Sequence, residues 1–166
     1  MKYNKGFDFW NEDHRDCNCG SYAFNLDEWY HPGSLCGEDE EEDIIENLEY
    51  WAEYGYEDDE LADELADFYL DRVANDFKND VTISLIEPDL DNLEDGVEVI
   101  AFRAGAYQWE GEYMDFDYDF HFKVYRYNNW FEKRGCEPVR ITSLNDWSGS
   151  IYYNSQTFYI THRLKI

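Results

Sequence analysis

Apolar residues recur at helical spacing in two consecutive segments of the first half of the chain. In the segment 41–56 these positions are Ile44, Ile45, Leu48, Trp51 and Ala52. In the segment 58–78 they are Leu61, Leu65, Phe68, Val73 and Phe77. Spacings of three and four residues are typical of amphipathic helices, and Gly55 between the segments indicates a break. The pattern therefore predicts an antiparallel helical hairpin. A shorter helix is expected within 20–30, ended by Pro32-Gly33.

From residue 81 onward the pattern changes to alternating or aromatic-rich runs, which are typical of strands. These runs cover residues 81–86, 97–104, 116–127, 130–133, 139–142 and 151–160. Asn128-Asn129 separates two of them and predicts a tight hairpin turn. The expected fold is α+β in a single domain, 1–166. It comprises an irregular cysteine-containing segment (1–37), an acidic helical hairpin (38–80) and an antiparallel sheet of about five strands (81–166).

The net charge is the most extreme property of the composition. The chain has 39 Asp and Glu against 13 Lys and Arg, a formal net charge of -26. Phosphate groups repel such a surface, so direct binding of nucleic acid or of an anionic membrane is not expected. A basic protein is the expected partner, because complementary potentials speed and select encounters. Aromatic residues make up 19% of the sequence, which indicates a folded chain.

No apolar stretch approaches the roughly 18 residues of a membrane span. The first five residues, Met1-Lys2-Tyr3-Asn4-Lys5, are followed by no apolar run of the kind found in a signal peptide. We therefore expect a cytoplasmic protein with reduced thiols.

Most of the negative charge lies in one stretch. Residues 38–95 contain 24 acidic residues and only two basic ones, Arg72 and Lys78. The helical period places many of these acids on the outer faces of the two predicted helices, and like charges at that spacing destabilise a helix. A partner-binding face is therefore predicted, although a plain solvated face is the alternative. Its residues are Glu42, Glu46, Glu49, Glu53, Asp58, Asp59, Asp63, Asp67 and Asp71.

With its aromatic-rich composition and the acidic run 38–43, the chain resembles phage-encoded DNA mimics and anti-CRISPR proteins. The resemblance covers composition and the helical hairpin, and no diagnostic motif supports it. It implies an inhibitor that occupies a cationic channel or a recognition lobe of a basic nucleic-acid-binding protein, such as an RNA-guided nuclease. The compartment it implies is the cytoplasm of an infected or prophage-carrying bacterial host.

Cysteine and histidine cluster in the N-terminal segment and suggest a metal site. Structural Zn²⁺ uses four thiolate or imidazole ligands in a tetrahedron. Cys17, Cys19, Cys36 and Cys136 form the predicted zinc set, with His14 or His31 as substitutes. The alternative is that these cysteines pack as small apolar residues.

A second interpretation of the same cysteines is catalytic. The motif Asn18-Cys19-Gly20-Ser21 at a predicted helix start, with His121 on a later strand, resembles papain-like or NlpC-like cysteine peptidases. The resemblance implies Cys19 as nucleophile and His121 as base, with Asn145 or Asp146 orienting the histidine. A helix N-terminus would also lower the thiol pKa. The alternative is an ordinary strand histidine.

Overall fold

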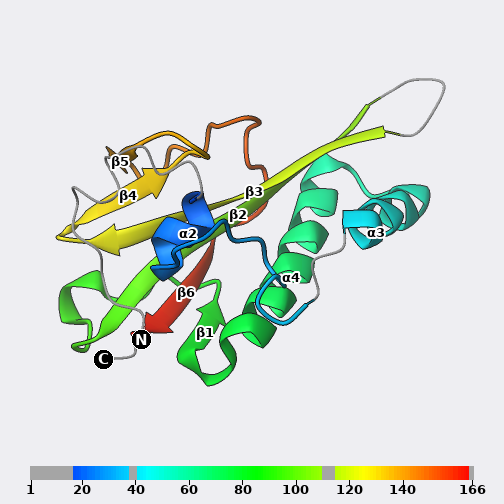
Figure 1. Cartoon of the computed structure of the whole chain (residues 1–166). Coiled ribbons are helices and arrows are strands. Elements are labelled where there is room, and N and C mark those ends of the chain that lie inside the picture. Colours follow the sequence, from blue (N-terminus) through cyan, green and yellow to red (C-terminus); the bar gives the residue numbers. More distant parts are fainter. Residues whose placement is uncertain (1–16, 38–40, 110–114, 165–166) are drawn as a thin grey trace.

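Helices precede the sheet in the part of the chain that the computed structural model describes, residues 17–37, 41–109 and 115–164. They are α2 (Cys19–Phe24), α3 (Glu41–Glu53) and α4 (Asp58–Phe77), labelled in Figure 1. The turn between α3 and α4 contains Gly55 with φ 90°, a conformation that favours glycine. The predicted helical hairpin is thereby confirmed. None of the described helices is long and apolar enough to cross a bilayer.

The strands form one antiparallel sheet in the order β1-β6-β2-β3-β4-β5. Their bounds are Val81–Ser84 (β1), Val97–Trp109 (β2), Asp115–Arg126 (β3), Asn129–Lys133 (β4), Val139–Thr142 (β5) and Phe158–Arg163 (β6). The sheet has one strand more than the five or so expected, and the α+β class is confirmed. The β3–β4 turn is formed by Tyr127 and Asn128, both with positive φ. It therefore lies one residue earlier than predicted.

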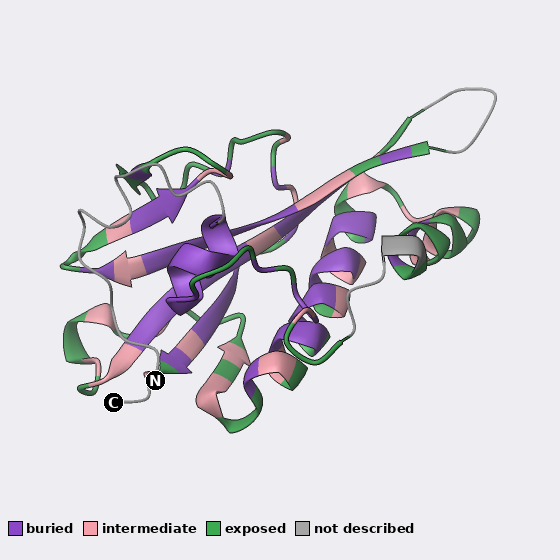
Figure 2. Ribbon diagram, in the orientation of Figure 1, coloured by how far each residue is buried: buried purple, intermediate pink, exposed green. Residues whose placement is uncertain are grey.

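The two faces of the sheet are covered differently. Helices α2 and α4 pack on one face, where even-numbered residues of β2 and β3 such as Phe102 and Phe122 enter the main core. Figure 2 shows that the sheet-facing sides of these helices are buried. The other face carries a smaller core around Trp147 and Tyr153, from the segment between β5 and β6. Side chains of alternate residues in β3 therefore enter different layers.

Strand β3 extends beyond the end of its neighbour β4. The ladder between them pairs residues 123–126 of β3 with residues 129–132 of β4. Residues 119–121 of β3 are therefore not paired with β4, and the chain turns away after Lys133. Helix α2 packs against β3 and β4 on the main-core face. Side chains from the two layers can meet at this point.

Candidate active site

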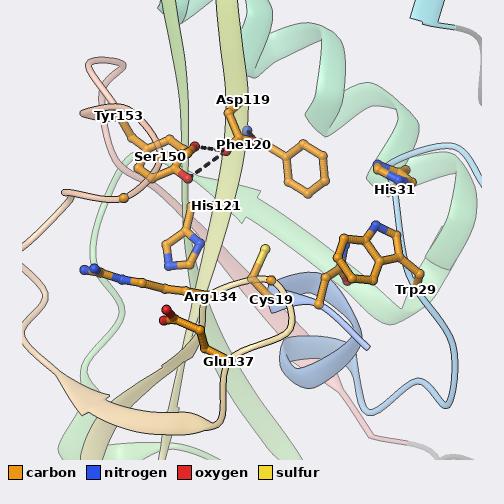
Figure 3. A pocket seen from close by; sticks show the side chains of 13 residues that line it. Cys19, Trp29, His31, Asp119, Phe120, His121, Arg134, Glu137, Ser150 and Tyr153 are labelled. Atoms are coloured by element: carbon orange, nitrogen blue, oxygen red, sulfur yellow. Dashed lines mark hydrogen bonds between the residues drawn. The ribbon is translucent and has the colours of Figure 1, made fainter. Parts of the chain in front are cut away.

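A pocket of about 510 Å³ lies where β3 extends past β4; we call it the Cys19 pocket (Figure 3). Its wall combines the start of α2, the following loop, β3, the turn after β4 and the loop before β6. The lining residues are Asn18, Cys19, Trp29, His31, Asp119, Phe120, His121, Arg134, Gly135, Glu137, Gly149, Ser150 and Tyr153. The two residues that the sequence nominated for catalysis, Cys19 and His121, thus line the same pocket.

Asn18 fixes the start of α2 against the next loop. Its side-chain oxygen accepts hydrogen bonds from the backbone amides of Ser21 (3.0 Å) and Tyr30 (3.2 Å). Its amide nitrogen donates to the carbonyl of Tyr30 at 2.8 Å. Gly20 permits this close packing, because a Cβ there would lie 2.6 Å from Cδ2 of Tyr30. The loop that carries Trp29 and His31 is therefore held beside Cys19.

Buried cations hold both ends of α2. Arg126 donates to the carbonyls of Tyr22 and Ala23 at 2.9 Å each and pairs with the buried carboxylate of Glu98. These carbonyls at the end of α2 need donors, which the guanidinium supplies. Before the helix, the buried ammonium of Lys133 donates to the carbonyl of Cys17. The position of Cys19 is thus set by contacts to β3 and β4.

The Cys19 thiol is uncharged at neutral pH. Burial raises its pKa to about 12, and the carboxylate of Asp119 adds to the rise. Backbone amides of Phe122 and Gly20 oppose this effect without overcoming it. The expectation that the helix N-terminus would lower this pKa is wrong, because α2 has six residues and the thiol is desolvated. Reaction of Cys19 at neutral pH therefore requires a base.

His121 lies in the smaller core and is held from two sides. Its ring stacks on Tyr153 with centroids 5.3 Å apart, and it meets Trp147 edge-to-face. Its Nε2 lies 2.9 Å from Oε2 of Glu132 on the neighbouring strand. No hydrogen bond from another described residue reaches Nδ1. In Figure 3 one ring nitrogen of His121 faces the side on which Cys19 lies.

Glu132 is fully buried but ionised. Burial alone would raise its pKa, but His121, Arg140 and Lys123 together lower it to about 2. Its second oxygen, Oε1, accepts hydrogen bonds from Arg134 at 3.1 Å and from Arg140 at 2.7 Å. An ionised carboxylate at Nε2 favours the tautomer that carries its proton there. Nδ1 is then a proton acceptor.

Glu132 was not predicted from the sequence. The expectation that Asn145 or Asp146 would orient His121 is wrong, because Nε2 of His121 instead lies 2.9 Å from Glu132, and Asp146 accepts hydrogen bonds from Ser148 at 3.2 and 2.6 Å. A signal for Glu132 was present. The two-residue hairpin turn places Glu132 opposite Lys123, which lies on the same face of β3 as His121.

The described residues do not bring the predicted zinc ligands together. No group of three or more His, Cys, Asp or Glu side chains among residues 17–37, 41–109 and 115–164 can hold an ion. Cys17 and Cys19 are buried, whereas Cys36 and Cys136 are exposed, so the predicted zinc set is not assembled. His31 lines the Cys19 pocket, and His14 lies outside the described residues.

The predicted acidic face divides into two parts. Asp58, Asp59 and Asp63 accept hydrogen bonds from Gln108, Asn154 and Gln156, so they hold β2 and the loop before β6. The remaining described side chains are exposed. These are Glu46, Glu49 and Glu53 on α3 and Asp67 and Asp71 on α4. Glu42 lies in α3, but its side chain is outside the described residues.

Comparison of the chain with protein-family models, curated proteins and solved structures found no match in any of the three. The function is therefore inferred from the geometry of the Cys19 pocket.

Proposed function

We propose that the protein is a cysteine-dependent hydrolase of amides or esters. Cys19 is the nucleophile, His121 is the general base and acid, and Glu132 orients His121. One observation carries this proposal: Nε2 of His121 lies 2.9 Å from a buried, ionised carboxylate, in a histidine that lines the same pocket as the Cys19 thiol. A nucleophile, a base and a group that orients the base are the components of nucleophilic catalysis.

The raised thiol pKa determines the order of proton transfers. Nδ1 of His121 takes the thiol proton as the sulfur of Cys19 attacks the substrate carbonyl carbon. The bond from that carbon to the leaving nitrogen or oxygen then breaks, and His121 delivers the proton to the leaving group. A water molecule next attacks the thioester, with His121 again as base. The products are a carboxylic acid and the free thiol.

An activated ester tests the proposal directly. With 4-nitrophenyl acetate we expect one equivalent of 4-nitrophenolate to be released rapidly, and mass spectrometry to locate the acetyl group on Cys19. Cys19→Ala abolishes this acetylation. His121→Gln slows it by about 10²–10⁴-fold, the usual contribution of a general base.

The exposed cysteines provide the matched controls. Cys36→Ser and Cys136→Ser remove thiols that do not line the pocket, so acetylation of Cys19 continues at the wild-type rate. Acetyl groups found on Cys36 and Cys136 in place of Cys19, or an unchanged rate in His121→Gln, would refute the proposal.

A second candidate function rests on the exposed acids of the hairpin. Glu46, Glu49 and Glu53 on α3 and Asp67 and Asp71 on α4 have no ion pair with a described cation. Unpaired like charges repel one another and cost stability, and binding of a basic partner would relieve this repulsion. The chain would then inhibit a nucleic-acid-binding protein, with a host RNA-guided nuclease as the partner that the resemblance implies.

Competition distinguishes this candidate from the first. The protein is expected to displace a DNA duplex from a purified RNA-guided nuclease at 50 mM salt and to do so much less at 200 mM salt. Changing Glu46, Glu49, Asp67 and Asp71 to their amides removes the effect, whereas Cys19→Ala leaves it intact. Displacement that is indifferent to salt and to the amide variants would contradict it.

A further inference from the structure

The Cys19 pocket has two chemically different halves on either side of the nucleophile. Figure 3 shows Trp29, His31 and Phe120 on one side of Cys19, with His121 and Arg134 on the other. If the proposed function holds, this asymmetry determines how a substrate lies. The inference that follows rests on that function and specifies its substrate.

The proton transfer by His121 determines which side of the pocket holds the leaving group and which holds the acyl group. The acyl carbon bonds to the sulfur of Cys19, and the leaving atom must come within hydrogen-bond reach of Nδ1 of His121. The leaving group therefore occupies the His121 side. The rest of the acyl group extends in the opposite direction, toward Trp29 and Phe120.

The acyl side of the pocket is lined by three aromatic rings, those of Trp29, His31 and Phe120, which we call the ring wall. The rings of Phe120 and His31 meet edge-to-face with centroids 5.7 Å apart, and the ring centroids of His31 and Trp29 are 6.4 Å apart. Trp29 is 40% exposed although it is one of the largest apolar side chains in the protein. An exposed indole at the wall of a pocket gains contact area when an aromatic group binds beside it.

The leaving-group side is polar. Arg134 donates through Nε to Glu132 at 3.1 Å, and its side chain is 26% exposed. Glu137 and Ser150 also line this side. A polar leaving group with an acceptor for Arg134 fits these side chains better than an apolar one.

We propose that the substrate is an amide or ester with an aromatic acyl group and a polar leaving group, and that Trp29 selects the acyl group. Acylation of Cys19 is then faster for an aromatic acyl donor than for a small one bearing the same leaving group. The preference for an aromatic acyl donor comes from its contact with the ring wall, and the reaction at the Cys19 sulfur is the same for both donors.

Two esters with the same leaving group test this assignment. Second-order rates of Cys19 acylation are measured with 4-nitrophenyl 3-phenylpropanoate and 4-nitrophenyl acetate, each checked by the mass of the Cys19 peptide. We expect the aromatic ester to react about tenfold faster or more. Trp29→Ala reduces this ratio severalfold, because it slows the reaction of the aromatic ester more than that of the acetate. Trp109→Ala removes an exposed tryptophan that does not line the pocket and preserves the ratio.

The outcomes separate the two proposals. If neither ester acylates Cys19, or if His121→Gln has no effect, the hydrolase function fails and the inference fails with it. If both esters acylate Cys19 in a His121-dependent way but at equal rates, the function stands and the aromatic preference is overturned. If the aromatic ester still reacts faster by the same ratio in Trp29→Ala, Trp29 does not select the acyl group.

Discussion

Beside the Cys19 pocket, the buried carboxylates of Glu132 and Glu98 are paired with cations, whereas the acids on the outer faces of α3 and α4 are exposed. The carboxylate of Glu132 pairs with His121, Arg134 and Arg140, and the carboxylate of Glu98 pairs with Arg126. On the hairpin, Asp43 on α3 forms an ion pair with Arg72 on α4 at 3.6 Å. Ion pairs fix positions in the first region, whereas most exposed acids of the second make no ion pair with a described cation. Substitutions should therefore have large effects in the first region and small ones in the second.

Arg126→Met should have the largest effect on stability. It leaves Glu98 buried without its cation and removes the donors at the end of α2, so we expect a loss of about 3–5 kcal/mol in the free energy of unfolding. Urea denaturation measures this. Adding Glu98→Gln should restore part of the loss. Equal stability of Arg126→Met and wild type would show that α2 is held by packing alone.

Acid should weaken the pocket region through Glu132. A carboxyl group with a pKa of about 2 in the folded state, against an ordinary value of 4.5, stabilises the fold at pH values above the ordinary pKa. That contribution, on the order of 2–4 kcal/mol, is lost as the pH falls from about 5 to about 2. Stability measured across this range should decline less steeply in Glu132→Gln. Identical slopes in the two proteins would exclude Glu132 as the source.

Within α4, two aspartates two turns apart should differ. Asp63 accepts hydrogen bonds from the backbone and side chain of Gln156 at 2.7 and 3.3 Å, so Asp63→Ala should cost about 1 kcal/mol. Asp71→Ala is the matched control, because it makes the same change at an exposed position of the same helix. Urea denaturation of both variants gives the difference. A larger loss in Asp71→Ala would reverse this assignment of the acidic face.

Asp67→Asn should have the smallest effect and the opposite sign. Partial burial, and then the charges of Asp71 and Asp63, raise the pKa of Asp67. A carboxyl group whose pKa is raised by folding destabilises the protein above that pKa, so neutralising it should stabilise the protein by a few tenths of a kcal/mol at low salt. Thermal unfolding at low and high salt measures this gain, which should shrink as salt screens the repulsion. A gain that grows with salt would contradict it.

The helices were predictable from the sequence because their apolar residues repeat over long segments. Strand β6 was misplaced, with 151–160 expected and Phe158–Arg163 observed. The reason is that Asn154 and Ser155 accept hydrogen bonds from the backbone amides of Ala106 and Ala104 through their side chains. This stretch therefore lies beside β2 without forming a ladder. A sequence pattern cannot distinguish such side-chain pairing from a strand.

The candidate site was predictable in part. Cys19 and His121 were recognised from a motif at a helix start and a histidine on a strand, and they line one pocket. Glu132 could have been found from the hairpin turn that sets the register of β3 and β4, although no motif marks it. The helix period could not show which acids of α4 bind the loop before β6. The uncharged state of Cys19 also depends on burial by segments distant in sequence. These features arise from tertiary packing, which local patterns do not encode.

The pH dependence of Cys19 acetylation by 4-nitrophenyl acetate tests the central claim most directly. A thiol with a pKa of about 12 cannot supply thiolate at neutral pH without help. If His121 accepts its proton, the wild-type rate should level off well below the pH at which the thiol itself ionises, whereas the rate for His121→Gln should keep rising with hydroxide beyond pH 10. Superimposable profiles for the two proteins would show that His121 does not activate Cys19.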